Sequence, residues 1–350
     1  MKTNSIFLCG LMVVAVTASS AIAQNDSIYR IRKSGKSSKQ TGKIQEISAL
    51  SVTFNGRNGP EKIPVWQIEK LAAGNEPSEV RKARDRIEAS RFEEAVELLD
   101  KVKLGGNPIT DAEVGFYRAL AKSRMAFSGG SVSAVDAGGE MGKFIEANGK
   151  SHHIVPATEM MGRLAMAAGK LDYAKQQFGN LTKSGWPEYV AKGYFMSGEV
   201  LMRQKEYPQA VAAFDQLIAL PGNDDLTQHY RRLAKCQKAK AEAMSGADVS
   251  ASIKALEAII KQENPDDREL FAYAYNALGS CHLKANDQAE ALEKFLLTHL
   301  VYATESAPHA EAVYQLADIW TTQKQTDRAS EVKQILNSRY RNTWWSSQLN

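Results

Sequence analysis

The sequence predicts a mainly α-helical protein, an α-solenoid of antiparallel helix pairs preceded by a small N-terminal antiparallel β-module. Three observations predict this fold. First, a triplet of two small residues and one large residue recurs along the chain at a fixed spacing. Second, apolar and polar residues before residue 75 alternate with the period of β-strands. Third, the apolar residues of later segments recur with the period of α-helices. The 350 residues are enough to bury a large core without disulfide bonds.

Residues 1–23 have the pattern of a secretory signal peptide. Lys2 supplies a positive charge, residues 6–16 form an apolar stretch too short to span a bilayer, and residues 21–23 (Ala-Ile-Ala) form a small-residue cleavage site. We expect cleavage between Ala23 and Gln24, so that the mature protein leaves the cytoplasm.

Residues 24–74 form the predicted β-module. Apolar and polar residues alternate in 28–33, 42–47, 51–54 and 61–66, and turn-forming residues at 55–60 separate the last two segments. Four strands of this length either curl into a compact SH3-like or Sm-like barrel or dock on the first helices. Gly74 to Pro77 marks the boundary to a helical domain at 75–350, with Ser78 as the expected helix cap.

The positive charge of the chain is concentrated in this module. The whole chain has a formal charge of +4, whereas residues 24–75 contain nine Lys or Arg and four Asp or Glu. An exported protein has little access to nucleic acid, so the basic residues favour an anionic lipid, an acidic glycan or an acidic protein face. A solvated face without a specific partner is the alternative. The basic surface comprises Arg30, Arg32, Lys33, Lys36, Lys39 and Lys43.

The helical domain is predicted from the recurring triplet of small, small and large residues. Small side chains on both helices of a pair let the backbones approach closely, and the aromatic residue fills the remaining space. The best unit runs from residue 191 to 222 and ends at a Pro-Gly turn, while a fourth, looser unit follows residue 316. Insertions near residues 129–130 and 245–246 leave the repeat count open. The triplets are Gly162, Ala174 and Phe178; Gly198, Ala210 and Phe214; and Gly279, Ala291 and Phe295.

This spacing resembles the G…A-x-x-x-F part of the tetratricopeptide repeat (TPR). The resemblance implies a right-handed superhelix of helix pairs that binds a peptide or protein in its concave groove. The C-terminal residues 336–348 resemble the ending of bacterial periplasmic TPR proteins that assist outer-membrane assembly or cell-envelope constriction. A periplasmic location is therefore expected, with Trp344 and Trp345 either sealing the last helix pair or anchoring a partner.

The resemblance also implies which side chains face the groove. They are aromatic, aliphatic, basic and polar residues of the first helices, a mixture that suits an extended peptide or a partner helix. Packing against neighbouring helices is the alternative for each of them. The predicted groove residues are Arg163, Met166, Phe195, Glu199, Met202, Arg203, Arg231, Lys235, Tyr273, Asn276, Leu283 and Tyr314.

The sequence offers no catalytic motif, and neither a cofactor nor a metal is expected. His152 and His153 are adjacent, which favours imidazoles that point apart, and no Cys, Asp or Glu lies near them at ligand spacing. Cys236 and Cys281 are expected to be buried free thiols.

These patterns favour a non-enzymatic exported adaptor that binds a protein or peptide partner in the cell envelope. One alternative is a structural protein that self-associates through its end repeats. The other is an enzyme with a site between the β-module and the solenoid. That alternative requires converging carboxylates or histidines there, and the sequence near the junction offers Glu61, Glu69, Glu76 and Glu79.

Overall fold

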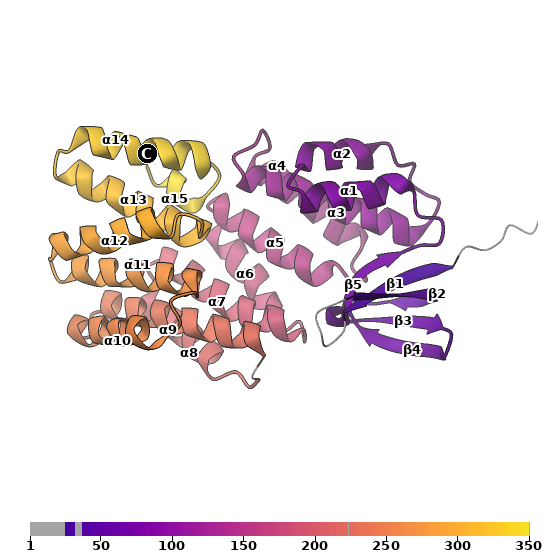
Figure 1. The fold of residues 1–350 in the computed structure, drawn as a ribbon, viewed down its shortest axis with the longest axis horizontal. Coiled ribbons are helices and arrows are strands. Elements are labelled where there is room, and N and C mark those ends of the chain that lie inside the picture. Colours follow the sequence, from indigo (N-terminus) through magenta and orange to yellow (C-terminus); the bar gives the residue numbers. More distant parts are fainter. Residues whose placement is uncertain (1–24, 32–36, 223, 350) are drawn as a thin grey trace, which may run out of the picture.

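The computed structural model describes residues 25–31, 37–222 and 224–349. The predicted signal peptide and three of the predicted basic residues, Arg32, Lys33 and Lys36, lie outside this range. Within it, a β-sheet is followed by a long array of helices (Figure 1). No helix among the described residues combines the length and the apolar character that crossing a bilayer requires.

The N-terminal module is one antiparallel sheet with the strand order β4-β3-β2-β1-β5. The second strand is shared, since its first half pairs with β1 and its second half with β3, with an irregularity between Ile44 and Glu46. A Cβ at Gly42 would lie 2.2 Å from the Asn55 carbonyl oxygen, so this close crossing requires glycine. The strands are β1 (Asp26–Ile31), β2 (Ser37–Ile47), β3 (Ser51–Gly56), β4 (Gly59–Pro64) and β5 (Ile68–Ala72), with the 3₁₀ turn η1 (Val65–Gln67) before β5.

The sequence-based prediction of four strands was one strand short. β5 was missed because Ile68 and Leu71 are three residues apart, which is a helical spacing, although Leu71 is fully buried against β1. Ser78 is also not the helix cap, because Pro77 occupies that position and no side chain caps the helix.

The helical domain contains, among the described residues, seven consecutive helix pairs and a short last helix. The helices are α1 (Ser78–Glu88), α2 (Phe92–Asp100), α3 (Pro108–Phe127), α4 (Ala134–Ala147), α5 (Ile154–Ala167), α6 (Leu171–Leu181), α7 (Pro187–Arg203), α8 (Tyr207–Ile218), α9 (Asp225–Ser245), α10 (Val249–Gln262), α11 (Arg268–Lys284), α12 (Gln288–Val301), α13 (Ser306–Thr322), α14 (Thr326–Arg339) and α15 (Trp344–Ser347).

The recurring triplets lie where the sequence predicts them, at the crossing of the two helices of a pair. A Cβ on Gly162 would lie 2.5 Å from the ring of Phe178, and a Cβ on Gly198 would lie 2.4 Å from the ring of Phe214. Both rings are fully buried. The small residues are therefore required by packing, as predicted.

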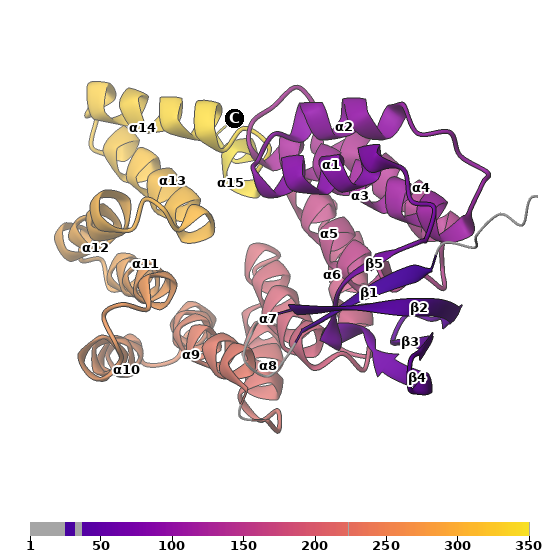
Figure 2. The same cartoon turned by 45° about the vertical axis from the view of Figure 1, so that its right-hand side comes forward.

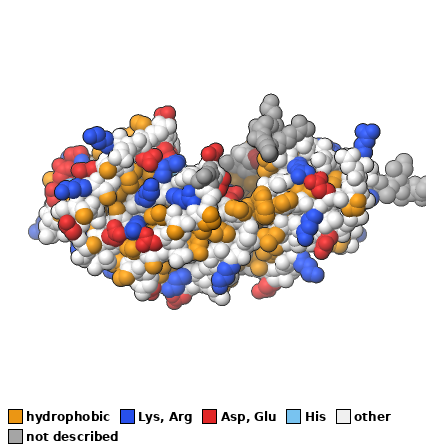
Figure 3. All heavy atoms as spheres, turned by 90° about the horizontal axis from the view of Figure 1, so that it is seen from below, with side chains coloured by type: hydrophobic (Ala, Val, Ile, Leu, Met, Phe, Trp, Pro, Cys, Tyr) orange, Lys and Arg blue, Asp and Glu red, His pale blue; other side chains and the backbone are white. Residues whose placement is uncertain are grey.

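The array curves until its last helices return to the early ones (Figure 2). The array thereby forms a closed ring of helices. The Asn342 side-chain amide joins its two ends by donating to the Ala126 carbonyl at 2.8 Å and the Val132 carbonyl at 3.3 Å. These partners are separated by more than 200 residues in the chain. The face seen in Figure 3 intermixes basic, acidic and hydrophobic side chains, which is typical of a solvated surface.

The β-module packs on two distant parts of the array. The ring of Trp66 in η1 lies 6.4 Å from that of Trp186, the residue before α7. On the other side, the Arg84 guanidinium of α1 donates to the Leu71 carbonyl of β5 at 3.3 Å. Cys236 and Cys281 are buried free thiols, as predicted.

Candidate functional site

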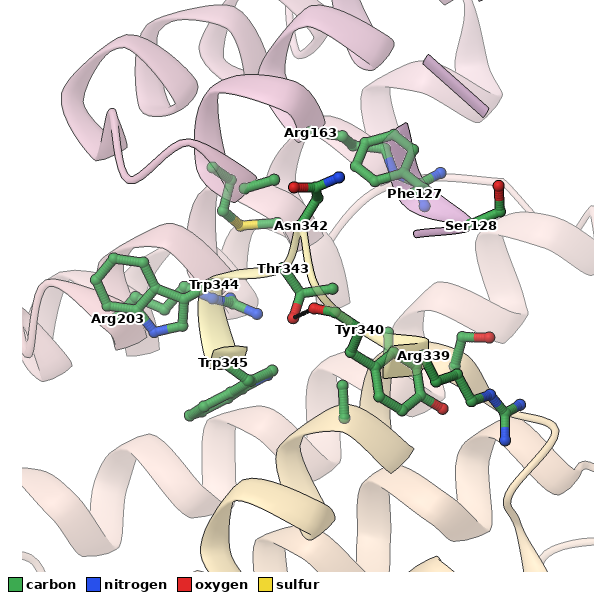
Figure 4. Close-up of a pocket in the computed structure, with 15 residues that line it drawn as sticks. Phe127, Ser128, Arg163, Arg203, Arg339, Tyr340, Asn342, Thr343, Trp344 and Trp345 are labelled. Atoms are coloured by element: carbon green, nitrogen blue, oxygen red, sulfur yellow. Dashed lines mark hydrogen bonds between the residues drawn. The ribbon is translucent and has the colours of Figure 1, made fainter. Parts of the chain in front are cut away.

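The candidate site is the inner, concave face of the helical ring, where α15 lies between two cavities. The first cavity has about 420 Å³ and is bordered by α3, α5, α7, α13 and the C-terminal segment, residues 339–349, which begins with the last residue of α14 (Figure 4). The second has about 500 Å³ and is bordered by α7, α9, α11, α13 and α15. Apart from the C-terminal segment and the start of α8, every helix that borders them is the first helix of its pair, as the sequence predicts for a groove.

The C-terminal segment forms a wall of both cavities. The Trp345 ring lies 5.2 Å from the ring of Tyr314 on α13, and the Arg203 guanidinium of α7 lies 5.6 Å from the Trp345 ring centroid. Trp344 lines both cavities as well, and Figure 4 shows it at the first. This segment therefore does more than seal the last helix pair, because it crosses the concave face to α7.

The first cavity is cationic. Arg163, Arg203 and Arg339 line it, and its described lining residues include no carboxylate. Arg163 lies over the ring of Phe127 at 5.4 Å, which leaves its guanidinium beside an apolar wall. An apolar cavity with three guanidinium groups suits a ligand that carries both a carboxylate and an apolar side chain.

The second cavity is lined by charges of both signs that pair with one another. The Glu199 carboxylate lies 3.0 Å from Arg203 and also accepts a hydrogen bond from the Gln237 amide. Lys240 on α9 forms an ion pair with Glu311 on α13. The Glu199–Gln237 contact joins α7 to α9 and the Lys240–Glu311 pair joins α9 to α13, whereas the Glu199–Arg203 pair lies within α7. Unlike the first cavity, the second is lined by carboxylates as well as by cations.

The structure divides the predicted groove residues into three groups. Arg163, Met166, Glu199, Met202, Arg203, Leu283 and Tyr314 line the cavities. Phe195, Tyr273 and Asn276 are only 2%, 6% and 1% exposed, so they pack inside the array instead of facing a ligand. Arg231 and Lys235 lie elsewhere: Arg231 donates to the Gly222 and Leu220 carbonyls, and Lys235 is exposed on α9.

Two sets of lining residues were not identified as groove residues from the sequence. Lys240 and Glu311 face each other from helices 71 residues apart, and Arg339 and Asn342 belong to the returning C-terminal segment. No local sequence signal identifies them, because their position depends on the curvature of the whole array.

A second cluster lies at the junction of the β-module and the array. His152 and His153, in the turn before α5, both approach Glu113 on α3. Their Nε2 atoms lie 3.5 and 2.9 Å from Glu113 Oε1. The expectation that these imidazoles point apart and lack an acidic neighbour was therefore wrong, because helix packing brings a carboxylate from 40 residues away.

This cluster is buried and contains an ionised carboxylate. Burial alone would raise the pKa of Glu113, but the neighbouring His153, His152 and Arg84 lower it to about 2. Burial and the nearby His153 lower the pKa of His152 to about 3. The Arg84 guanidinium donates to Glu113 Oε2 at 2.6 Å and to both oxygens of Glu76 at 2.7 and 2.9 Å. Of the four carboxylates considered at the junction, Glu76 belongs to this cluster.

Comparison with known proteins identifies the repeats. A model of the tetratricopeptide repeat family matches residues 159–224 and 242–300. The matched residues are tetratricopeptide repeats. A comparison with curated protein sequences found no significant match.

Two solved structures have a fold similar to that of this array. A tetratricopeptide repeat protein from Parabacteroides merdae ATCC 43184 aligns over 75% of this chain and 92% of its own, with a TM-score of 0.55 and 17% identity. A Rap protein complexed with Competence and Sporulation Factor aligns over 77% of both chains, with a TM-score of 0.50 and 13% identity. At these identities the likeness concerns the fold.

Proposed function

We propose that the chain is an exported, non-enzymatic adaptor of the cell envelope whose TPR array binds a segment of a partner protein on its concave face. The supporting observation is the first cavity, in which Arg163, Arg203 and Arg339 surround an apolar space beside Trp345. Its volume of about 420 Å³ fits one or two side chains. The partner segment is therefore expected to place a carboxylate next to an aromatic or aliphatic side chain there.

TPR folds generally serve binding rather than catalysis, which agrees with the lack of a catalytic motif in the sequence. The Rap protein of similar fold was solved with a bound factor. That complex concerns the Rap protein, and it supports a protein-binding role for this chain through the shared fold.

A peptide array tests this proposal. Random peptides with a free C-terminal carboxylate and the same peptides with C-terminal amides are probed with the mature chain, and fluorescence anisotropy gives the affinity of the best binders. We expect binders rich in acidic and aromatic residues. Arg163→Gln and Arg203→Gln are expected to weaken binding about tenfold or more, since a charge-assisted hydrogen bond contributes roughly 1.5–3 kcal/mol.

Lys235→Gln is the matched control, because Lys235 is an exposed cation of a first helix outside both cavities. Equal losses for Lys235→Gln and Arg203→Gln would mean that general charge attraction, and not the cavity, causes binding. Unchanged binding by both arginine variants would refute the proposed site.

Export is part of the same proposal. N-terminal sequencing of the protein from its native cells should begin at Gln24. A chain from these cells that still begins at Met1 would contradict export. It would not contradict the proposed binding site, which the peptide experiment tests separately.

A further inference from the structure

We propose that Glu113, His152 and His153 form a binding site for a divalent transition-metal ion, with zinc as the case to test. The two imidazoles and the carboxylate each offer one ligand atom, and these three atoms lie within 4.8 Å of one another. The proposal rests on the geometry, the charge and the surroundings of this cluster, and it is independent of the proposed function of the concave face.

The local backbone turns both histidines toward the same side. The Ser151 hydroxyl accepts a hydrogen bond from the His153 amide at 3.2 Å, which bends the chain just before α5. His153 then stacks on Phe116 with ring centroids 3.8 Å apart and an interplanar angle of 6°. Packing thus fixes the orientation of this ring before any ion binds.

The distances are close to those of a zinc site. With bonds of about 2.0–2.1 Å in a tetrahedron, two ligand atoms lie about 3.3 Å apart. The Nε2 atoms of His153 and His152 are 2.9 and 3.5 Å from Glu113 Oε1. Each ring would coordinate through the Nε2 lone pair and carry its proton on Nδ1.

The charges of the cluster favour a cation. Glu113 and Glu76 bring two negative charges, and Arg84 brings one positive charge. The side chains of Arg84 and Glu113 are 5% and 1% exposed, so an excess negative charge there is costly. A metal ion between the imidazoles and Glu113 would balance it.

The surroundings resemble those of known metal ligands in two respects. The second oxygen of Glu113 is held by Arg84, which is the kind of outer contact that orients a ligating carboxylate. A cavity of about 320 Å³, lined by Ile47 of the β-module and by α3, opens onto His152 and Glu113. It leaves room for water as the fourth ligand.

Metal titration of the tag-free mature chain tests the proposal. After chelator treatment and dialysis, isothermal titration with Zn²⁺ should show one site per chain, and the melting temperature should rise with Zn²⁺ concentration. Loss of a residue that only orients a metal ligand weakens metal binding by about 10–100-fold. His152→Gln removes a ligand itself, so it should weaken zinc binding by more than this.

His229→Gln is the matched control, because His229 also lies beside carboxylates, at 3.1 Å from Glu269 and 3.6 Å from Asp267, but outside the cluster. It should bind zinc like the wild type. Absence of zinc binding by the wild type would overturn the proposal. Equal zinc affinity for the wild type and His152→Gln would also overturn it.

X-ray absorption of the zinc-loaded wild type provides a measurement that needs no variant. Two histidine nitrogens and oxygen ligands are expected around the ion. A spectrum with sulfur ligands or with oxygen alone would place the ion elsewhere and refute the site.

Discussion

Replacing Gly198 by alanine tests the packing that defines the repeats. Gly198 is on α7, and a Cβ there would lie 2.4, 2.5 and 2.9 Å from three ring atoms of Phe214. Carbon atoms in contact normally lie about 3.5–4.0 Å apart, so the ring would have to move by about 1 Å. Phe214 is fully buried, and its close-packed surroundings resist such a movement.

Two effects of opposite sign determine the outcome. Overpacking of a core costs about 1–3 kcal/mol. Alanine in place of a helical glycine gains up to about 1 kcal/mol. Because the added methyl group would overlap the Phe214 ring so closely, we expect a net loss of about 1–2 kcal/mol of unfolding free energy for Gly198→Ala.

Gly138→Ala is the control that separates the two effects. Gly138 is inside α4, and no heavy atom lies within 4 Å of its added Cβ. This variant should gain stability, so the difference between the two variants measures the overpacking alone. Urea unfolding followed by circular dichroism gives both midpoints. If Gly198→Ala is stabilised as much as Gly138→Ala, the reasoning about the helix crossing is refuted.

Two other predictions concern the C-terminal part of the ring. Burial and the neighbouring His299 and Arg339 lower the pKa of His309 to about 4. The unfolded chain therefore binds an extra proton between about pH 4 and 6.5, so acidification from pH 7.5 to 5 should lower the unfolding free energy by up to about 2 kcal/mol relative to His309→Gln. Parallel urea titrations at pH 7.5 and 5 check this, and equal pH dependence of both proteins would contradict it. Asn342→Ala removes the two hydrogen bonds that close the ring, so amide exchange of residues 343–349 should accelerate while that of α9 stays unchanged. Unaltered exchange in both regions would show that these bonds do not hold α15.

The helix pairs were predictable because their determinants are local. Gly198, Ala210 and Phe214 lie within 17 residues, and the same steric requirement recurs in each good unit. Repetition of one packing rule makes such a pattern visible in a single sequence. The alternation of apolar and polar residues that predicts the strands of the β-module is also a local pattern. β5 is the exception, because its apolar residues have a helical spacing and the burial of Leu71 in the folded sheet makes it a strand.

The candidate site was predictable only in part. The periodicity identifies the inner face of each first helix, and Arg203 and Met202 indeed line the cavities. The periodicity does not show whether a side chain on that face is exposed in the groove or buried between helices. Phe195 and Tyr273 have rings 5.7 Å apart and are buried because α7, α9 and α11 pack closely. The Glu113 and His153 contact is equally invisible in the sequence, since it depends on how α3 packs beside the start of α5.

The closed ring determines how a partner can use the concave face. With α15 in place, the cavities of about 420 and 500 Å³ are separated by Trp344 and Trp345, so each admits an anchoring side chain while a long segment cannot run straight through. A partner that follows the whole groove has to replace the contacts of Trp345 with Tyr314 and Arg203. Its affinity is then reduced by the free energy that holds α15, since only the open fraction of the chain is competent to bind. Short anchors in the arginine-lined cavity avoid this cost, which is why the acidic and aromatic peptides proposed above are the first ligands to test.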